Sequence, residues 1–269
     1  MRISDARLLV LDTETTGIDP ATARVVELGG VLLEAGRPIK RMRSLIYPGG
    51  PIPAEATKVH GISDAEVAGA PPFEDLADRL VDLLEGVDAT AGYNGMGYDA
   101  KVLAEELWRA MVYPPPPQLV ERMLDPLVFV RQHLRHLRER NLGAIAEHFG
   151  VRLDEAHTAV ADALAAAEVI WEMVGAGLIP DDIDEALRLQ REFAALQGVE
   201  GGEWSFWIYE DRARPGLLRI GCGKHCGAEL DAVPPGYAKA ILDKVADLPD
   251  RVRAEFERIA AKGGGRRRR

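Results

Sequence analysis

The sequence predicts an α/β fold followed by a small second module, and three observations support this prediction. Three apolar stretches near the N-terminus have the pattern of consecutive β-strands. Helical patterns then alternate with one further short strand up to residue 175. After residue 203 the composition changes, because Trp204, Phe206, Trp207 and Tyr209 concentrate aromatic side chains in a short segment.

The first predicted strand, at residues 7–11, is apolar after Arg7, as expected of a buried strand. The second and third strands are predicted at residues 24–33 and 39–47, and the turn between them indicates an antiparallel hairpin. A fourth strand is predicted at residues 89–92. We expect these strands to form one sheet.

Helices are predicted where apolar residues recur at spacings of three and four, as in FEDLADRLVDLL at residues 73–84. The other predicted helices span residues 54–59, 64–67, 100–111, 126–140, 142–149 and 158–174. The chain accordingly divides into an α/β domain at 1–175, a helical linker at 176–202, a small module at 203–262 and a disordered basic tail at 263–269.

The composition limits the class of protein. A chain of 269 residues, 47% hydrophobic and 28% charged, can bury a full core. The most apolar stretch, residues 159–179, contains Asp162, Glu168 and Glu172 and is too polar to cross a bilayer. Two cysteines give no disulfide framework. We expect a cytoplasmic protein that does not bind membranes. The net charge of −10 argues against a general nucleic-acid coat protein, but not against an enzyme with a local nucleic-acid site.

Two carboxylates follow the first predicted strand. In LDTETTG, residues 11–17, Asp12 and Glu14 alternate and therefore point to the same face of an extended chain. Their repulsion would cost roughly 2–3 kcal/mol at an intermediate dielectric. A polar strand end entering a turn would explain them without any chemistry. An aspartic protease is excluded because Glu14 separates Asp12 from Gly17. A haloacid-dehalogenase-type phosphatase and a Mg²⁺ or Mn²⁺ site remain open at this point.

Further candidates lie in two later segments. Asp99, in GYNGMGYDAKVL at residues 92–103, opens a predicted helix and could simply cap it. His157 precedes the next candidate helix and Asp162 lies on its early turns. The two can converge only if His157 lies in the entering loop. Alanines around Asp162 leave little bulk, so this helix can approach another element closely, although an alanine-rich packing helix explains the same pattern.

Taken together, these motifs resemble the DEDDh exonucleases, the DnaQ-like family typified by the epsilon subunit of DNA polymerase III. The resemblance spans residues 7–174 and includes VHGIS at 59–63 and NLGAIAEHFGV at 141–151. Most members have Phe where Tyr98 stands, a mild departure. The resemblance implies a ribonuclease H-like exonuclease fold, with a central mixed sheet flanked by helices. The later motifs of the phosphatase are missing.

The resemblance also implies roles for individual residues. Asp12, Glu14, Asp99 and Asp162 would hold two Mg²⁺ or Mn²⁺ ions, and His157 would act as the general base. The terminal nucleotide would meet further residues, which are Thr15, Thr16, Gly17, His60 and Asn94. The expected activity is a 3′→5′ exonuclease that releases nucleoside 5′-monophosphates from DNA in proofreading or repair. A 3′→5′ exoribonuclease, or a polymerase or repair subunit that acts mainly by binding, remain alternatives.

The C-terminal segment has a second, weaker resemblance, to the small module of exodeoxyribonuclease X-like proteins. Lys224, His225, the Val-Pro pair at 233–234 and Tyr237 match that pattern, whereas Cys222 replaces the usual Phe. This module could contact nucleic acid or serve packing. Zinc is disfavoured because only three candidate ligands occur there.

Overall fold

The computed structural model describes residues 1–153, 158–196, 207–211, 214, 216–221, 225, 227–245, 248 and 250–262. It divides the chain into two compact units, Met1–Gly202 and Glu203–Arg269. The first unit carries the acidic motifs. No helix among the described residues is long and apolar enough to cross a membrane.

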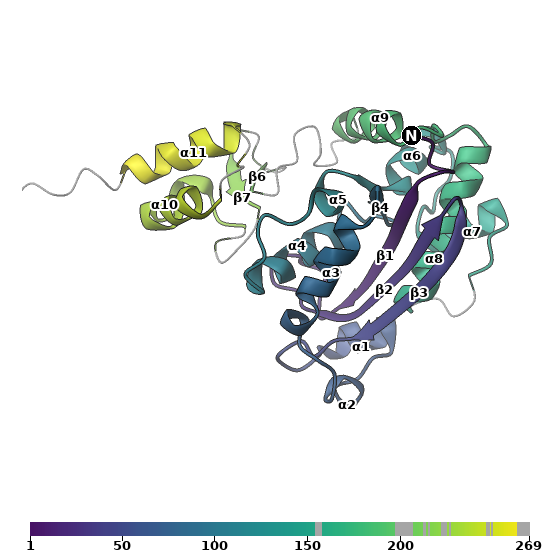
Figure 1. The fold of residues 1–269 in the computed structure, drawn as a ribbon, viewed down its shortest axis with the longest axis horizontal. Coiled ribbons are helices and arrows are strands. Elements are labelled where there is room, and N and C mark those ends of the chain that lie inside the picture. The colour runs from purple at the N-terminus through teal and green to yellow at the C-terminus, as the bar shows by residue number, and fades with distance from the viewer. Residues whose placement is uncertain are drawn as a thin grey trace, which may run out of the picture. The chain divides into compact units, whose positions relative to one another are not determined.

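The first unit is built on a five-stranded mixed sheet in the order β3-β2-β1-β4-β5 (Figure 1). Its strands are β1 (Arg7–Thr15), β2 (Val25–Glu34), β3 (Arg37–Leu45), β4 (Ala89–Ala91) and β5 (Met123–Leu124). The first three strands form the antiparallel meander that the sequence predicts, and β4 and β5 extend the sheet in parallel. This architecture confirms the predicted ribonuclease H-like fold class.

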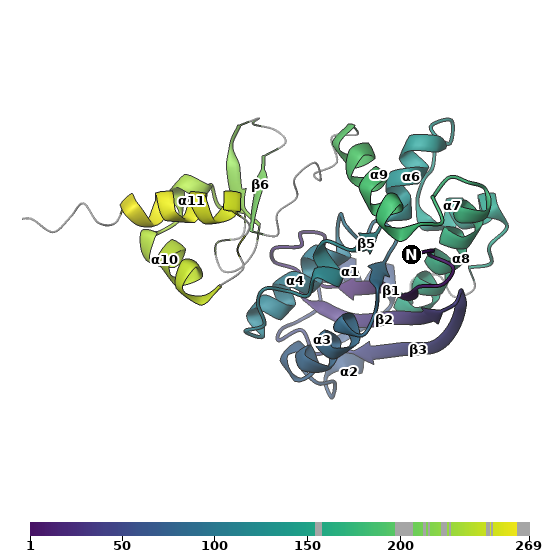
Figure 2. The ribbon, with the colours of Figure 1, turned by 45° about the horizontal axis from the view of Figure 1, so that its top comes forward.

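Helices surround this sheet (Figure 2). They are α1 (Ala54–His60), α2 (Asp64–Val67), α3 (Ala77–Glu85), α4 (Asp99–Arg109), α5 (Pro117–Val120), α6 (Pro126–His133), α7 (Leu142–Phe149), α8 (Ala159–Gly175) and α9 (Ile183–Leu196), with a 3₁₀ turn at Phe73–Asp75. α8 packs across β1 and β2. The core on this side of the sheet joins Leu8 and Val10 of β1 with Ala163 and Ile170 of α8.

β1 is longer than the apolar run that predicts it. The strand continues through Asp12 and Glu14 to Thr15 because β2 pairs with it along that whole length. β4 pairs with β1 only from Leu8 to Val10, so the last residues of β1 have no strand partner on that side. Asp12 and Glu14 therefore lie at the end of β1, where this strand pairs with β2 but not with β4.

Two helices differ from their predicted form. α6 ends at His133 rather than continuing to residue 140. Arg131, Arg135 and Arg138 would stack like charges at spacings of three and four on such a helix, which is unfavourable. Residues 176–202 were expected to form a helical linker, and α9, which lies within them, buries Ile183 and Leu187 in the core of the first unit.

The second unit has its own small core. β6 (Ile208–Glu210) and β7 (Leu218–Ile220) form an antiparallel pair, followed by a 3₁₀ turn at Leu230–Ala232 and by α10 (Pro235–Lys244) and α11 (Asp250–Ala261). Trp207 and Phe256 are buried and meet edge to face, with their ring centroids 6.3 Å apart. Cys222, Lys224, Cys226 and the basic tail lie outside the described residues.

Candidate metal centre

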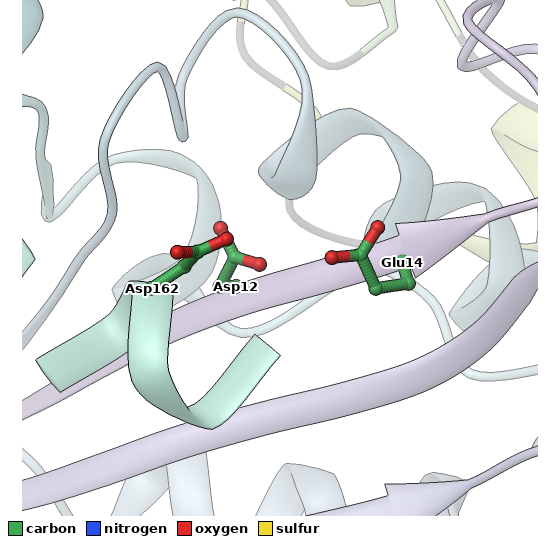
Figure 3. Close-up of side chains that lie close together, drawn as sticks. All are labelled: Asp12, Glu14 and Asp162. Atoms are coloured by element: carbon green, nitrogen blue, oxygen red, sulfur yellow. The ribbon is translucent and has the colours of Figure 1, made fainter. Parts of the chain in front are cut away.

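Three carboxylates from two elements converge at the end of β1. Asp12 and Glu14 project from the strand, and Asp162 reaches them from the first turns of α8 (Figure 3). One oxygen atom of each carboxylate lies within 4.8 Å of the other two, and all three residues are partly buried. The alternation along β1 and the early position on α8 thus bring together three of the four predicted metal ligands.

Asp162 can reach β1 because α8 rests directly on β2. In the β1–β2 register Asp12 is opposite Gly29. A Cβ atom on Gly29 would lie 2.3 Å from the carbonyl carbon of Ala159, so only glycine allows the helix this close. The small residues at both positions explain the close approach that the alanine-rich sequence predicts.

A buried glutamate, Glu27, binds the N-terminal end of α8 through a hydrogen bond. Glu27 is opposite Glu14 in the β1–β2 register and is only 1% exposed. One of its oxygens accepts a hydrogen bond from the Ala159 backbone N–H at 3.0 Å, and the other pairs with the Arg43 guanidinium. The start of α8 is therefore attached to the strand that neighbours the acidic cluster.

Asp99 occupies a distinct position beside the cluster. It is the first residue of α4 and is buried, and its Oδ1 accepts hydrogen bonds from the Thr13 backbone N–H at 2.9 Å and the Thr13 hydroxyl at 2.6 Å. It is not in the group of three carboxylates within 4.8 Å. Its charge nevertheless raises the pKa of Asp12. Asp99 thus lies next to the cluster, and its Oδ1 is hydrogen-bonded to Thr13 of β1.

The surroundings of Asp12, Glu14 and Asp99 favour the binding of protons or cations to these carboxylates. Burial raises the pKa of Asp12 well above its ordinary value, and the charges of Asp99 and Asp162 raise it further. Burial, followed by the Asp162 charge, raises the pKa of Glu14 to about 8. Burial likewise raises the pKa of Asp99 to about 6, against the two Thr13 hydrogen bonds, which lower it. Bound cations would relieve this repulsion.

The predicted base, His157, lies outside the described residues. Thr158 is the N-cap residue of α8, although its side chain makes no capping hydrogen bond. α8 therefore begins at Ala159, three residues before Asp162, and His157 stays the predicted base.

The Thr15–Gly17 turn, predicted to meet substrate, is held by internal contacts. The Thr15 hydroxyl donates to the Gly17 carbonyl at 2.9 Å, and the Tyr98 hydroxyl contacts both of these oxygen atoms. The Thr16 hydroxyl accepts from the Arg24 backbone N–H at 2.9 Å. The turn is thus fixed before any ligand binds.

His60 and Asn94 differ in their placement. His60 is buried, and its Nδ1 accepts from the Ile62 N–H at 3.0 Å. Burial lowers its pKa, and the Thr15 carbonyl offsets part of that shift, so His60 lies beside the end of β1. Asn94 has a left-handed backbone, with φ 61°, and its N–H donates to Asp125 at 2.9 Å. These contacts bind Asn94 to its own turn and to α6.

The donor set fits a hard divalent cation. Carboxylate oxygens are the ligands that Mg²⁺ and Mn²⁺ prefer, and the cluster contains no nitrogen or sulfur donor among the described residues. The same arrangement argues against a purely structural role, because the raised pKa values of Asp12 and Glu14 mean that the clustered acids cost stability when no cation is present.

Comparison with known proteins identifies the family. The model of the exonuclease family RNase_T matches residues 9–170, which include most of β1 and most of α8. The chain belongs to this exonuclease family. The two motifs that form the acidic cluster both lie inside the matched region, so the cluster is part of the exonuclease domain itself.

Two relatives of this chain are DNA polymerase III proteins. The PolC-type DNA polymerase III of Listeria monocytogenes is 28% identical over 179 residues, which is 64% of this chain but only 12% of that polymerase. The epsilon subunit of DNA polymerase III from Aquifex aeolicus is 28% identical over 172 residues, which is 63% of this chain and 81% of the subunit. The predicted resemblance to the DnaQ-like family is confirmed.

Solved structures show the same fold. The zinc-bound complex of Escherichia coli ExoI with ssDNA superimposes with a TM-score of 0.60 at 19% identity, covering 72% of this chain and 45% of that one. Exonuclease X in complex with 5′-overhanging duplex DNA superimposes with a TM-score of 0.51 at 21% identity, covering 67% of this chain and 99% of that one. These likenesses establish the exonuclease fold.

Three polar residues with structural contacts in this domain were not picked out from the sequence, and they are Thr13, Glu27 and Glu106. Glu27 had a visible signal, as the one acidic residue inside the apolar run of β2. Glu106 is 1% exposed on α4 and binds Arg24 and the Val25 N–H, and so holds the start of β2. Nothing in the spacing of Thr13 or Glu106 indicates their partners.

Proposed function

We propose that this exonuclease removes nucleotides from the 3′ end of DNA and releases nucleoside 5′-monophosphates, in proofreading or repair. One observation carries the proposal, the convergence of Asp12, Glu14 and Asp162 within 4.8 Å at the end of β1 in a chain of the exonuclease family. The DNA polymerase III relatives support DNA as the substrate. The matched region is only 12% of the PolC-type polymerase, so that relative does not establish a partner for this chain. We therefore propose, in addition, that the chain associates with a polymerase or a repair complex.

In this proposal Asp12, Glu14 and Asp162, together with Asp99, hold two Mg²⁺ or Mn²⁺ ions. When bound, such ions lower the pKa of water and stabilise charge on the departing 3′ oxygen. The protein residues bind and orient these ions. His157 accepts the proton of the attacking water as general base, in the loop that enters α8. Asp99 would contribute its second oxygen, because the Thr13 hydrogen bonds both go to Oδ1.

The terminal nucleotide would lie against the Thr15–Gly17 turn. Thr15, Thr16 and Gly17 offer backbone groups next to Glu14, and the hydroxyls of the two threonines are already used in holding the turn. His60 offers the buried Nε2 at the same strand end. Asn94 stays a predicted substrate residue, and its backbone N–H donates a hydrogen bond to Asp125.

The test compares DNA and RNA strands of one sequence, each labelled at the 5′ end. With Mg²⁺ or Mn²⁺ we expect the DNA label to remain on a ladder that shortens by single nucleotides, and EDTA to stop the reaction. A blocked 3′ end should resist digestion. Asp12→Asn protein, purified in parallel, controls for contaminating nucleases. Release of the label as a mononucleotide at the outset would contradict the direction, and faster RNA degradation would identify an exoribonuclease.

A further inference from the structure

Glu27 is built into the interface between β2 and α8. In the β1–β2 register Glu27 lies opposite Glu14 and Gly29 lies opposite Asp12. Because alternate residues of a strand share a face, Glu27 and Gly29 flank the two acidic residues on the face that α8 covers. Gly29 provides space for the helix backbone, and Glu27 provides a polar contact to it.

The contact lies at the first turn of α8, where a helix needs an acceptor. The first N–H groups of a helix have no partner within the helix, and the N-cap side chain of Thr158 makes no capping bond here. Glu27 supplies the acceptor from another element, at 3.0 Å from the Ala159 nitrogen. Its negative charge also matches the positive end of the helix dipole.

Ala159 and Asp162 share one side of the helix. Residues three apart on a helix are neighbours on its surface, so holding Ala159 against β2 directs Asp162 toward β1. Arg43, from β3, pairs with the remaining oxygen of Glu27 and fixes the direction of the carboxylate. Glu27 is therefore occupied on both oxygens and is not part of the cluster of Asp12, Glu14 and Asp162.

We propose that Glu27 is a positioning residue, which holds the first turn of α8 on β2 and so places Asp162 against Asp12 and Glu14 for cation binding. This inference rests on the proposed metal-dependent function only in its last step. The attachment of α8 is a property of the metal-free protein as well. Removing a residue that orients a metal ligand typically lowers metal affinity by about 10- to 100-fold.

The test uses Glu27→Leu, which removes the acceptor, and Glu27→Gln, which keeps an oxygen that can accept from Ala159. The matched control is Glu106→Leu, because Glu106 is equally buried and ion-paired but holds the start of β2 instead. Two quantities are measured on the full chain, the Mn²⁺ affinity by electron paramagnetic resonance and the hydrogen exchange of peptides that cover residues 158–165.

We expect Glu27→Leu to lower Mn²⁺ affinity by about 10-fold or more and to speed exchange in the first turn of α8. Glu27→Gln should retain most of the affinity, and Glu106→Leu should lose thermal stability without losing affinity. If Glu27→Leu and Glu106→Leu lower stability alike and neither changes affinity or exchange at α8, the positioning role is wrong. If Glu27→Gln binds Mn²⁺ as poorly as Glu27→Leu, the charge itself is required and Glu27 is not a hydrogen-bond anchor.

The two proposals fail in different ways. Should wild-type protein bind Mn²⁺ and digest no nucleic acid, the proposed function is wrong while the affinity series still decides the role of Glu27. Should wild-type protein bind no Mn²⁺, hydrogen exchange alone decides whether Glu27 holds α8. If Glu27→Leu does not fold, Glu27→Asp replaces it, because the shorter side chain keeps the charge but withdraws the acceptor from Ala159.

Discussion

Gly29 of β2 and Ala159 of α8 are in direct backbone contact, since a Cβ atom on Gly29 would lie 2.3 Å from the Ala159 carbonyl carbon. We predict that Gly29→Ala forces α8 away from the sheet. The free energy of unfolding should fall by about 1–3 kcal/mol or more, as in other overpacked sites. Asp162 moves with the helix, so Mn²⁺ affinity should fall too. Urea denaturation and Mn²⁺ titration measure the two effects.

The neighbouring Gly30 offers a matched control on the other face of β2. A Cβ atom there would meet the Leu11 side chain at 3.2 Å and the end of the Met42 side chain at 3.4 Å, both of which can shift. Gly30→Ala should therefore lose less stability and keep its Mn²⁺ affinity. Equal effects of the two substitutions would contradict the special role of the β2–α8 contact.

Asp12→Ala should separate activity from stability. The substitution removes a proposed metal ligand, so we expect the exonuclease rate to fall by several orders of magnitude. It also removes the repulsion that Asp12 shares with Asp99, Asp162 and Glu14, so the melting temperature in EDTA should rise. Differential scanning fluorimetry and gel assays check this. Glu34→Ala, at the exposed far end of β2, should change neither. Full activity of Asp12→Ala would contradict the metal-centre proposal.

The metal-free protein should lose stability as the pH rises. The pKa of Glu14 in the folded protein is about 8, against 4.5 without the fold, and the pKa of Asp12 is raised for the same reason. Between these values the folded state binds more protons than the unfolded state, so stability falls with increasing pH. We expect the melting temperature in EDTA to decrease from about pH 5 to about pH 8.

Saturating Mg²⁺ should flatten this dependence, because ionised carboxylates then bind the cation instead of a proton. A smaller slope should remain, since burial raises the pKa of Asp125 to about 7 and Asp125 lies in the α6 cap rather than in the cluster. A melting temperature that rises with pH in EDTA would show that the acidic cluster does not govern stability.

Much of the site was predictable because it depends on local periodicity. Alternation along β1 placed Asp12 and Glu14 on one face, and the alanines of α8 indicated a close approach that brings in Asp162. The engagement of Asp99 by Thr13 was not predictable. β4 pairs with β1 only as far as Val10, so the Thr13 N–H beyond that point has no strand partner on this side and can donate to the Asp99 side chain.

Long-range contacts account for the other differences. Glu27 stood out in an apolar strand, but the strand sequence does not say which helix lies over it. The α9 segment has an amphipathic pattern that suits a linker helix equally well, and only packing against α6 and β5 assigns it to the first unit. β5 has two residues, too few for any periodic signal.

Tyr98→Phe should weaken substrate binding more than catalysis. The Tyr98 hydroxyl holds the Thr15–Gly17 turn through Thr15 and the Gly17 carbonyl. Losing one hydrogen bond costs about 0.5–1.5 kcal/mol, which corresponds to a two- to tenfold rise in KM if the turn binds ground and transition states alike. Steady-state kinetics on a DNA oligonucleotide check this, with Tyr47→Phe, an exposed tyrosine, as control. A lower kcat with unchanged KM would place Tyr98 in the chemical step instead.

His157→Ala should lose most of the activity and keep metal binding, because the imidazole acts on water rather than on the cations. General-base catalysis contributes about 10²- to 10⁴-fold, so kcat should fall by at least this range while Mn²⁺ affinity stays unchanged. The pH–rate profile should also lose its acidic limb, because no imidazole base then has to be deprotonated. His148→Ala, in the last turn of α7, is the matched control and should retain the acidic limb. A His157→Ala enzyme with the wild-type rate and profile would mean that the carboxylates and their cations activate water without a protein base.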